Sequence, residues 1–178
     1  MDEKERIAKA ALAELPADGA ILLDAGSTTY QLAEALPRDR ELTVVTNSVA
    51  IASMLTSWPN LELMLVGGLL RHGTSAAVGP WSLHALRDTF VDVAFLGADG
   101  VSTTAGLTTS DEAVASFKRA VVGSSRRVVL LADHTKLGRE GPARFAGLLD
   151  IDTVITDSGV DPATLRAIAD AGPQVVAA

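Results

Sequence analysis

Seven short apolar runs, with helical patterns between most of them, constrain the fold more than any other feature of this sequence. They are rich in Val, Leu and Ile and occupy residues 20–24, 42–46, 61–66, 91–97, 126–132, 152–156 and 174–177. The runs do not alternate apolar with polar residues, as strands with one solvated face would. Buried strands separated by helices favour an α/β fold with an open, doubly wound parallel sheet.

Helical patterns fill most of the intervals between these runs. We expect helices over residues 4–19, 27–36, 48–55, 111–122 and 161–172. The first of them begins almost at the start of the sequence, which suggests that another segment precedes it. Two Gly-rich connections, 67–80 and 97–112, interrupt the alternation, and loops of this length in a compact domain are usually functional.

Composition excludes several classes of protein. The 178 residues suffice for one domain with a real core, and the absence of cysteine excludes disulfides, thiol nucleophiles and sulfur-ligated zinc. The net charge is −7 and the largest basic cluster is the pair Arg126–Arg127, so this chain alone is a poor nucleic-acid binder. No apolar run reaches the length of a membrane span, and the first residues do not resemble a signal peptide. We therefore expect a cytoplasmic protein without membrane partners.

Small and hydroxylated residues follow the first apolar run. The sequence "DAGSTT" places Asp24 at the end of the predicted strand, and Gly26, Ser27, Thr28 and Thr29 where the helix should start. Free backbone amides at the first turn of a helix form a ready anion site. A capping box, with Thr28 as the N-cap and Gln31 reaching back, explains the same residues without a ligand. The segment alone leaves both interpretations open.

Two further polar segments are predicted at the same edge of the sheet. Asn47 and Ser48 follow the second run, where helix capping is the simpler interpretation. Gly67 and Gly68 end the third run, as turn residues or to leave clearance for a ligand. His72 in the following loop is interpreted as a solvated side chain. Parallel strands nevertheless bring all their carboxyl ends to one edge, where open α/β sheets bind ligands.

The segment "GADGVSTTAGLTTSDE" carries the densest set of polar residues. Asp99, between Gly97 and Gly100, could accept a hydrogen bond from a sugar hydroxyl, act as a base, or close an Asx-turn. Glu112 fits a capping box with Thr109. Downstream, Asp111 and Lys118 are seven residues apart on one helix face, where we expect a solvated pair.

A last polar segment, "ADHTKLG", follows the fifth run. Lys136 could contact a phosphate or lie in a surface turn. No metal-ligand spacing, nucleophile elbow, Walker loop or other cofactor motif is present, so we expect neither metal nor cofactor. Taken together, five polar strand ends predict a pocket for a small polar molecule, and their residue types favour an anion.

The ordered motifs resemble one protein family. "DAGSTT", "VVTNS", "LVGGLLR", "VGP", "FLGADG", "GLTTSDE", "FKRAVV" and "ADHTKLG" look like the C-terminal sensor domain of DeoR-family transcriptional regulators, over a match from about Lys4 to the end. The resemblance implies an open, mostly parallel Rossmann-like sheet flanked by helices, related to ribose-5-phosphate isomerase and glucosamine-6-phosphate deaminase. It also implies a phosphorylated sugar effector that alters DNA binding by an N-terminal winged helix-turn-helix.

The resemblance assigns effector-binding roles residue by residue. The positions that match the family pattern are Asp24, Gly26, Ser27, Thr28, Thr29, Asn47, Ser48, Gly67, Gly68, Asp99, Gly100, Glu112, Lys118 and Lys136. The winged helix-turn-helix itself has no counterpart here. We therefore expect residues 1–18 to form a linker helix after that missing domain, and residues 19–178 to form the sensor domain.

Three functions remain in competition at this stage. A repressor's sensor for a sugar phosphate is favoured, as a homo-oligomer that contacts operator DNA only through the missing domain. An isomerase or deaminase on the same fold is the alternative, but "GADGVS" lacks the histidine that a deaminase would carry after the acid and glycine. A pure oligomerisation module is the third. The identity of the sugar cannot be read from the loops.

Overall fold

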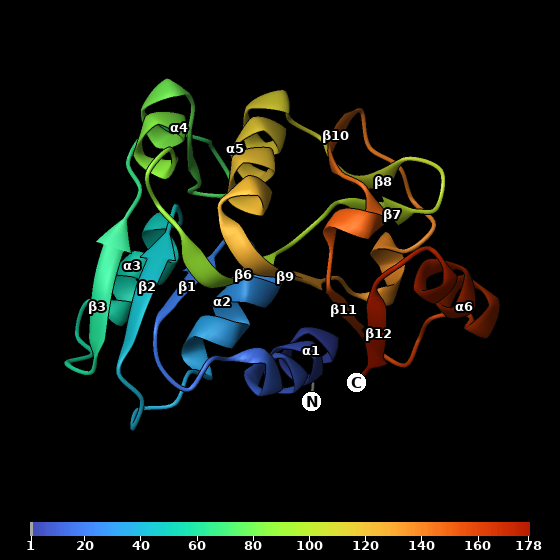
Figure 1. Cartoon of the computed structure of the whole chain (residues 1–178), viewed down its shortest axis with the longest axis horizontal. Helices are drawn as coiled ribbons and strands as arrows, with labels where there is room; N and C mark the ends of the chain where they lie inside the picture. Colours follow the sequence, from blue (N-terminus) through green and yellow to red (C-terminus); the bar gives the residue numbers. More distant parts are fainter. Residues whose placement is uncertain (1) are drawn as a thin grey trace.

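A seven-stranded sheet dominates the computed structural model, which describes residues 2–178. Its strands are β1 (Ala20–Leu23), β2 (Leu42–Thr46), β3 (Leu61–Leu65), β6 (Val91–Leu96), β9 (Ser125–Leu131), β11 (Thr153–Thr156) and β12 (Gln174–Ala177). Every neighbouring pair is parallel. Each strand coincides with one of the seven apolar runs to within two residues at either end, so the predicted parallel sheet is confirmed (Figure 1).

The order of the strands creates a switch point in the middle of the sheet. The order is β12-β11-β9-β6-β1-β2-β3, so the chain first builds outward from β1 on one side and then returns to β6 on the other. The connections after β1 and β6 therefore leave in opposite directions. A crevice forms between the carboxyl ends of these two strands because the connections diverge there. Ligands of open α/β sheets bind in such a crevice.

Helices cover both faces of the sheet. One face carries α1 (Glu3–Ala11), α2 (Ser27–Glu34) and α3 (Val49–Leu55), and the other carries α4 (Pro80–Leu86), α5 (Glu112–Gly123) and α6 (Pro162–Asp170). In Figure 1, α4 and α5 lie above the strands and α1 and α2 below them. The helix expected over 4–19 is shorter than predicted: α1 ends at Ala11 and continues only as the 3-10 turn η1 (Leu12–Glu14).

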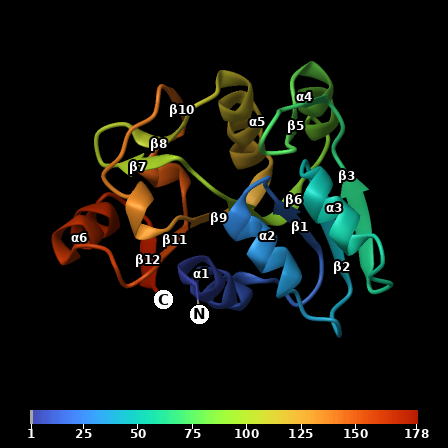
Figure 2. The same ribbon diagram turned by 180° about the vertical axis from the view of Figure 1, so that it is seen from behind.

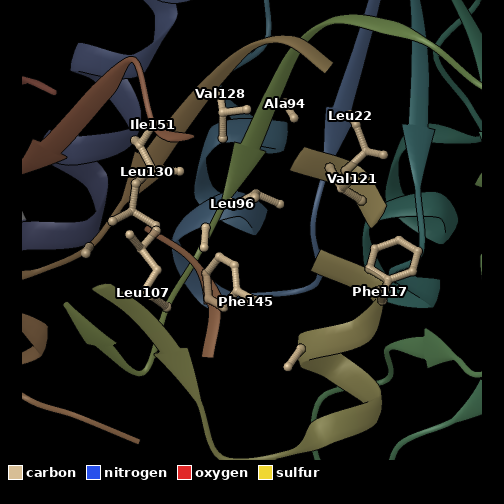
Figure 3. Packing of buried hydrophobic residues seen from close by; sticks show 14 of the residues in the cluster. Leu22, Ala94, Leu96, Leu107, Phe117, Val121, Val128, Leu130, Phe145 and Ile151 are labelled. Carbon is tan, nitrogen blue, oxygen red and sulfur yellow. The ribbon is translucent and has the colours of Figure 1, made fainter. Parts of the chain in front are cut away.

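Strand residues alternate between two separate apolar cores. Leu22, Ala94 and Leu96 point to the α5 side and pack with Phe117 (Figure 3). Their neighbours along the same strands point to the α1–α3 side and pack with residues such as Leu32. Both faces of each strand are therefore buried, which explains why the runs show no alternation of apolar and polar residues.

The two Gly-rich connections contain structure that was not predicted. In the first, β4 (Leu69–Leu70) pairs with β5 (Ala77–Val78) as a short hairpin, directly followed by α4. In the second, β7 (Gly100–Ser102) pairs with β8 (Gly106–Thr109), and β10 (Ala143–Ala146) completes a three-stranded antiparallel sheet. Two further 3-10 turns are η2 (His134–Lys136) and η3 (Leu148–Asp150). None of the helices over residues 2–178 is long and apolar enough to cross a membrane.

Candidate functional site

A cavity of about 200 Å³ lies at the carboxyl edge of the sheet, at the switch point. Its walls come from the segments after β1, β6 and β9, from α5 and from the first turn of α1. Its lining residues are Lys4, Ala25, Gly26, Ser27, Thr28, Thr29, Thr74, Gly97, Ala98, Asp99, Lys118, Leu131, Ala132, Asp133 and Lys136. A second cavity of about 240 Å³ adjoins it, and the two share Ala25, Thr74, Asp99 and Lys118. Three of the five predicted strand ends therefore meet here.

The first turn of α2 opens into this cavity without a side-chain cap. Gly26 is the N-cap, with extended backbone, and no side chain accepts a hydrogen bond from the first amides. The predicted capping box with Thr28 is wrong, because the helix begins at Ser27 and Thr28 already lies inside it. The amides of the first turn, at the positive end of the helix dipole, therefore have no side-chain acceptor among the described residues.

The hydroxyl of Thr29 has a different role from its neighbours. It donates to the carbonyl oxygens of Asp24, at 2.6 Å, and Gly26, at 2.9 Å. Thr29 is buried, whereas Ser27 is exposed. Thr29 therefore holds the shape of the turn, and Ser27 and the turn amides are better placed to meet a ligand.

A buried ion pair between Asp24 and Lys118 lies at the crevice. Lys118 Nζ of α5 lies 2.7 Å from Asp24 Oδ2, and both side chains are almost fully buried. Lys118 also donates to the carbonyl oxygen of Gly97 at 2.6 Å, and the Gly97 amide lies 3.3 Å from Asp24 Oδ2. The pair thus connects the ends of β1 and β6 to α5. The expected solvated pair between Asp111 and Lys118 is wrong, since Lys118 is buried against Asp24.

Asp111 and Glu112 both differ from the predicted pattern. Asp111 is the N-cap of α5 and accepts hydrogen bonds from the amides of Ala113 and Val114. Its carboxylate also pairs with Arg71 from the β4–β5 hairpin. The predicted capping box with Glu112 is wrong because the helix starts there, and Glu112 is an exposed side chain 3.5 Å from Arg119. Glu112 does not line the cavity.

Asp99 presents a carboxylate held by the neighbouring β8 segment. Its Oδ2 accepts hydrogen bonds from Thr109 Oγ1 and the Ser110 amide, both at 2.9 Å. These partners are ten and eleven residues away, so Asp99 does not close an Asx-turn. Burial alone would raise the pKa of Asp99, but these hydrogen bonds and the charge of Lys118 hold the pKa below its ordinary value. Asp99 is therefore an ionised acceptor in the cavity wall.

Two further lysines line the cavity. Lys136 ends η2, whose N-cap Asp133 accepts a hydrogen bond from the Thr135 amide at 3.0 Å. Lys4 reaches the cavity from α1. Among residues 2–178, neither ammonium group has a hydrogen-bond or ion-pair partner. Lys4 was missed at the sequence level, although it extends the buried stripe of Ile7, Ala8 and Ala11 by one turn.

Asn47 and Ser48 do not line either cavity. Asn47 is buried, and its side chain accepts a hydrogen bond from the Ala25 amide and donates one to the Ala77 carbonyl. Ser48 caps α3 by accepting from the Ile51 amide at 3.2 Å. Their polar atoms are satisfied by the protein itself, so they support the site from outside it.

The remaining predicted glycines also lie away from the cavity wall. The Gly67 carbonyl accepts a hydrogen bond from Ser82 Oγ at 2.7 Å. Gly68 has a φ of +159°, and a Cβ there would lie 2.5 Å from the Val78 carbonyl oxygen, so the position needs glycine for packing. A Cβ at Gly100 would lie 2.5 Å from the Arg139 carbonyl oxygen. These three glycines shape the loops around the site.

One cluster beside the cavity contains metal-type donors. The donor atoms of Glu3, His134 and Asp157 lie within 4.8 Å of one another, although the residues are too far apart in sequence to form a recognisable spacing. His134 Nδ1 lies 2.9 Å from Asp157 Oδ2, and the His134 and Gly159 amides donate to the same carboxylate. Burial alone would raise the pKa of Asp157, but these bonds hold it below its ordinary value. The hydrogen bonds account for the buried acid without a metal.

Comparison with known proteins shows the family to which the sequence is similar. Residues 1–158 match the family model described as the DeoR C terminal sensor domain. The HTH-type transcriptional regulator GlpR of Haloferax volcanii is 39% identical over 176 residues, 99% of this chain and 69% of that protein. The glycerol-3-phosphate regulon repressor of Escherichia coli is 29% identical over 169 residues, 95% of this chain and 67% of that protein.

Solved structures with the same fold include two ribose 5-phosphate isomerases. The enzyme of Methanocaldococcus jannaschii has a TM-score of 0.54 and 20% identity, over 75% of this chain and 52% of that chain. A D-ribose-5-phosphate isomerase in complex with phospho-erythronic acid has a TM-score of 0.53 and 23% identity, over 76% of this chain and 55% of that chain. The predicted relation of the fold to ribose-5-phosphate isomerase is thereby confirmed, and the chain spans about half the length of these enzymes.

Proposed function

The chain belongs to the DeoR C-terminal sensor domain family, the effector-binding part of DeoR-type repressors, and from this premise we propose that its cavity binds a phosphorylated sugar or a related intermediate. The observation that carries the proposal is the uncapped first turn of α2 in one cavity with Lys4 and Lys136, two lysines without a hydrogen-bond or ion-pair partner among residues 2–178. A phosphate monoester carries a charge of about −1.5 to −2 at pH 7 and three strong acceptor oxygens. Backbone amides and ammonium groups are its usual partners.

The two ends of the cavity suit the two parts of such a ligand. The phosphate binds to the amides of the Gly26–Thr28 turn and to Lys136. The sugar hydroxyls extend toward the second cavity, where Asp99, an ionised acceptor, receives their hydrogen bonds. The name of the glycerol-3-phosphate regulon repressor, a relative at 29% identity, supports a small phosphorylated polyol or sugar as the ligand class.

Control of DNA binding requires a part of the protein beyond this domain. The GlpR and glycerol-3-phosphate repressor relatives are longer than the stretch they share with this chain by about a third of their length. Because the shared domain is named as C-terminal, we propose that their DNA-binding unit precedes it. A net charge of −7 is consistent with a basic surface located elsewhere. A homo-oligomer would match the two-fold symmetry of a typical operator.

We propose binding without turnover. Lys118, which lines the cavity together with Asp99, is held by the carboxylate of Asp24 and the carbonyl of Gly97, so its ammonium group is already engaged by the protein. The curated relatives described above are transcriptional regulators. The test is an NMR assay with sugar phosphates: conversion of an aldose phosphate to its ketose isomer, or release of ammonia, would replace this proposal with the enzyme alternative.

Ligand binding is tested by thermal shift and calorimetry with phosphorylated and unphosphorylated forms of the same sugars. Only phosphorylated forms should stabilise the domain, by about 2.7 kcal/mol at a hundred times the dissociation constant. Thr28→Val and Lys136→Ala should each weaken binding without unfolding the domain. Lys9→Ala is the matched control, because Lys9 is an exposed lysine paired with Glu5. Unchanged affinity in both cavity variants would remove the phosphate from this turn.

A further inference from the structure

The first turn of α1 is part of the cavity, which is unexpected for a helix predicted to be a linker. We infer that Lys4 binds the anionic group of the effector together with Lys136, so that effector binding fixes the first turn of α1 to the carboxyl edge of the sheet. The inference rests on the proposed function and adds to it a binding residue and a route for regulation.

The position of Lys4 on α1 directs its side chain toward the sheet. Ile7, Ala8 and Ala11 form the buried face of the helix, with exposed fractions of 0%, 1% and 0%. Residues three and four apart lie on one face of a helix, so Lys4 precedes Ile7 and Ala8 on that buried face. There it reaches past the apolar core to the cavity, where it is one of the lining residues. Its side chain is only partly buried, so the stem can lie along the apolar face while the ammonium group remains at the cavity.

Two of the three lysines that line the cavity are available to pair with a bound anion. Lys118 is neutralised by Asp24. Asp99 and Asp133 line the cavity too, but each already accepts hydrogen bonds from its own neighbourhood. Lys4 and Lys136 are the lining cations without a partner among residues 2–178. Two ammonium groups attract a phosphate dianion more strongly than Lys136 alone would, in a wall that also carries the carboxylates of Asp99 and Asp133.

A second contact connects α1 to the lysine-bearing turn. Glu3, the neighbour of Lys4, has its Oε1 3.8 Å from Nδ1 of His134. His134 belongs to η2 together with Lys136, and is itself anchored 2.9 Å from the buried Asp157. Both partners of the Glu3–His134 contact are partly exposed, so it contributes little by itself. An anion bound between Lys4 and Lys136 would add a stronger connection between α1 and η2.

Through this connection, effector binding would control the position of α1 and of any segment that precedes it. Under the proposed function, the DNA-binding unit of relatives such as the HTH-type regulator GlpR precedes the shared sensor domain. α1 is the first helix of the sensor domain and lies beside α2 (Figures 1 and 2). An effector that binds only when the first turn of α1 is docked shifts the population toward the docked state. The orientation of whatever precedes α1 then depends on the effector.

The experiment compares Lys4→Gln with Lys9→Gln, two substitutions on the same helix. Lys9 is exposed, pairs with Glu5 at 3.1 Å and is not among the residues that line the cavity. Glycerol 3-phosphate and inorganic phosphate serve as probes in calorimetry. Lys4→Gln should weaken binding of both about tenfold or more, as expected for a lost charge-assisted hydrogen bond, while Lys9→Gln should leave the affinity within about twofold.

Hydrogen exchange separates a direct contact from a general loss of stability. With either probe, amide exchange in a peptide spanning residues 2–12 should slow in the wild-type chain and in Lys9→Gln, but not in Lys4→Gln. Wild-type affinity in Lys4→Gln, or probe binding that leaves exchange in α1 unchanged, would overturn this inference and leave the proposed function intact. Failure of the wild-type chain to bind any phosphorylated compound would overturn both.

Discussion

Two neighbouring strand-to-helix turns have nearly the same sequence pattern but opposite uses. The turn from β1 to α2 and the turn from β2 to α3 each place hydroxyl-bearing residues after a buried parallel strand. In the first, Gly26 is the N-cap and leaves the amides of α2 open to a cavity. In the second, Ser48 caps α3 with its own side chain. Only the uncapped turn can bind an anion with its amides.

The capped turn also supports the open one. Thr46 Oγ1 donates to the Leu23 carbonyl at 2.7 Å, and Asn47 Oδ1 accepts from the Ala25 amide at 3.2 Å. These bonds hold the chain on both sides of Asp24. The two turns therefore differ in whether the protein already satisfies the polar atoms of their residues, and only atoms left unsatisfied are open to a ligand.

The largest difference in stability between the two turns should come from Asp24. Asp24→Ala leaves the buried ammonium group of Lys118 without its carboxylate, and breaking a buried pair in this way costs about 3–5 kcal/mol. Urea denaturation of the variant measures this loss. The second turn has no buried ion pair, so no single substitution at Thr46, Asn47 or Ser48 should cost as much.

A double variant provides the control for that prediction. Asp24→Ala with Lys118→Met removes both charges and retains an apolar side chain of similar length, so most of the stability should return. If the double variant is no more stable than Asp24→Ala alone, the lost stability does not come from the unpaired lysine, and the role assigned to the ion pair is wrong.

A matched pair of serines tests the comparison directly. Ser48→Ala removes the cap of α3 and should destabilise the domain by about 1 kcal/mol, without changing the affinity for phosphate. Ser27→Ala removes an exposed hydroxyl at the cavity and should change stability by less than about 0.5 kcal/mol, while weakening phosphate binding. Thermal denaturation and calorimetry measure the two effects. The same response in both variants would mean that the two turns do not differ in function.

The sheet could be predicted from the sequence because its signal is local. Each strand is a run of Val, Leu and Ile long enough to be recognised without its neighbours, and helices between the strands require parallel pairing. The hairpin β4–β5 and helix α4 could not be predicted in the same way. The strands of that hairpin have only two residues each, and α4 is a single short helix in a Gly-rich region.

The site could be predicted only in part, because partners distant in sequence decide the role of each polar residue. The strand ends predicted Gly26–Thr29, Asp99 and Lys136 at one edge, and the family resemblance added Lys118; the structure places all of them in the cavity wall. It could not show that Asn47 would be satisfied by Ala25 and Ala77. The place of Lys4 depends on how α1 packs on the sheet, which no local pattern records.

Low pH should reduce the stability of the domain through Asp99, in the cavity beside the open turn, and not through the residues of the capped turn. The folded state holds the pKa of Asp99 below its ordinary value of 3.8, so its ionised form adds stability above that pH and the contribution is lost as the pH falls through the folded pKa. Thr46, Asn47 and Ser48 do not titrate. Urea midpoints at about pH 6 and about pH 3 should therefore differ less in Asp99→Asn than in the wild-type chain.

Because Asp99 is exposed, this effect should be smaller than the loss of the Ser48 cap. If the urea midpoint falls equally with pH in Asp99→Asn and in the wild-type chain, the acid sensitivity comes from other carboxylates. Asp157 is the first to consider, since hydrogen bonds from His134 and Gly159 also hold its pKa below the ordinary value.

The substitution with the smallest expected effect on stability is one that converts the open turn into a capped one. Gly26→Asp places a carboxylate at the N-cap of α2, where aspartate is preferred over glycine by a few tenths of a kcal/mol. The backbone at Gly26 is extended and accepts any residue, and the nearest atom to a new Cβ would be Thr29 Oγ1 at 3.2 Å. The variant should therefore be as stable as the wild-type chain or slightly more so.

The same substitution should abolish phosphate binding. The new carboxylate would accept hydrogen bonds from the amides that the phosphate uses, and its charge would repel the incoming anion. Gly26→Asn is the matched control for charge, since it caps the helix as well without adding a negative group. Full affinity in Gly26→Asp would show that the first turn of α2 does not bind the anion. Weaker binding in both variants, more severe in Gly26→Asp, would show that capping and anion binding compete for the same amides.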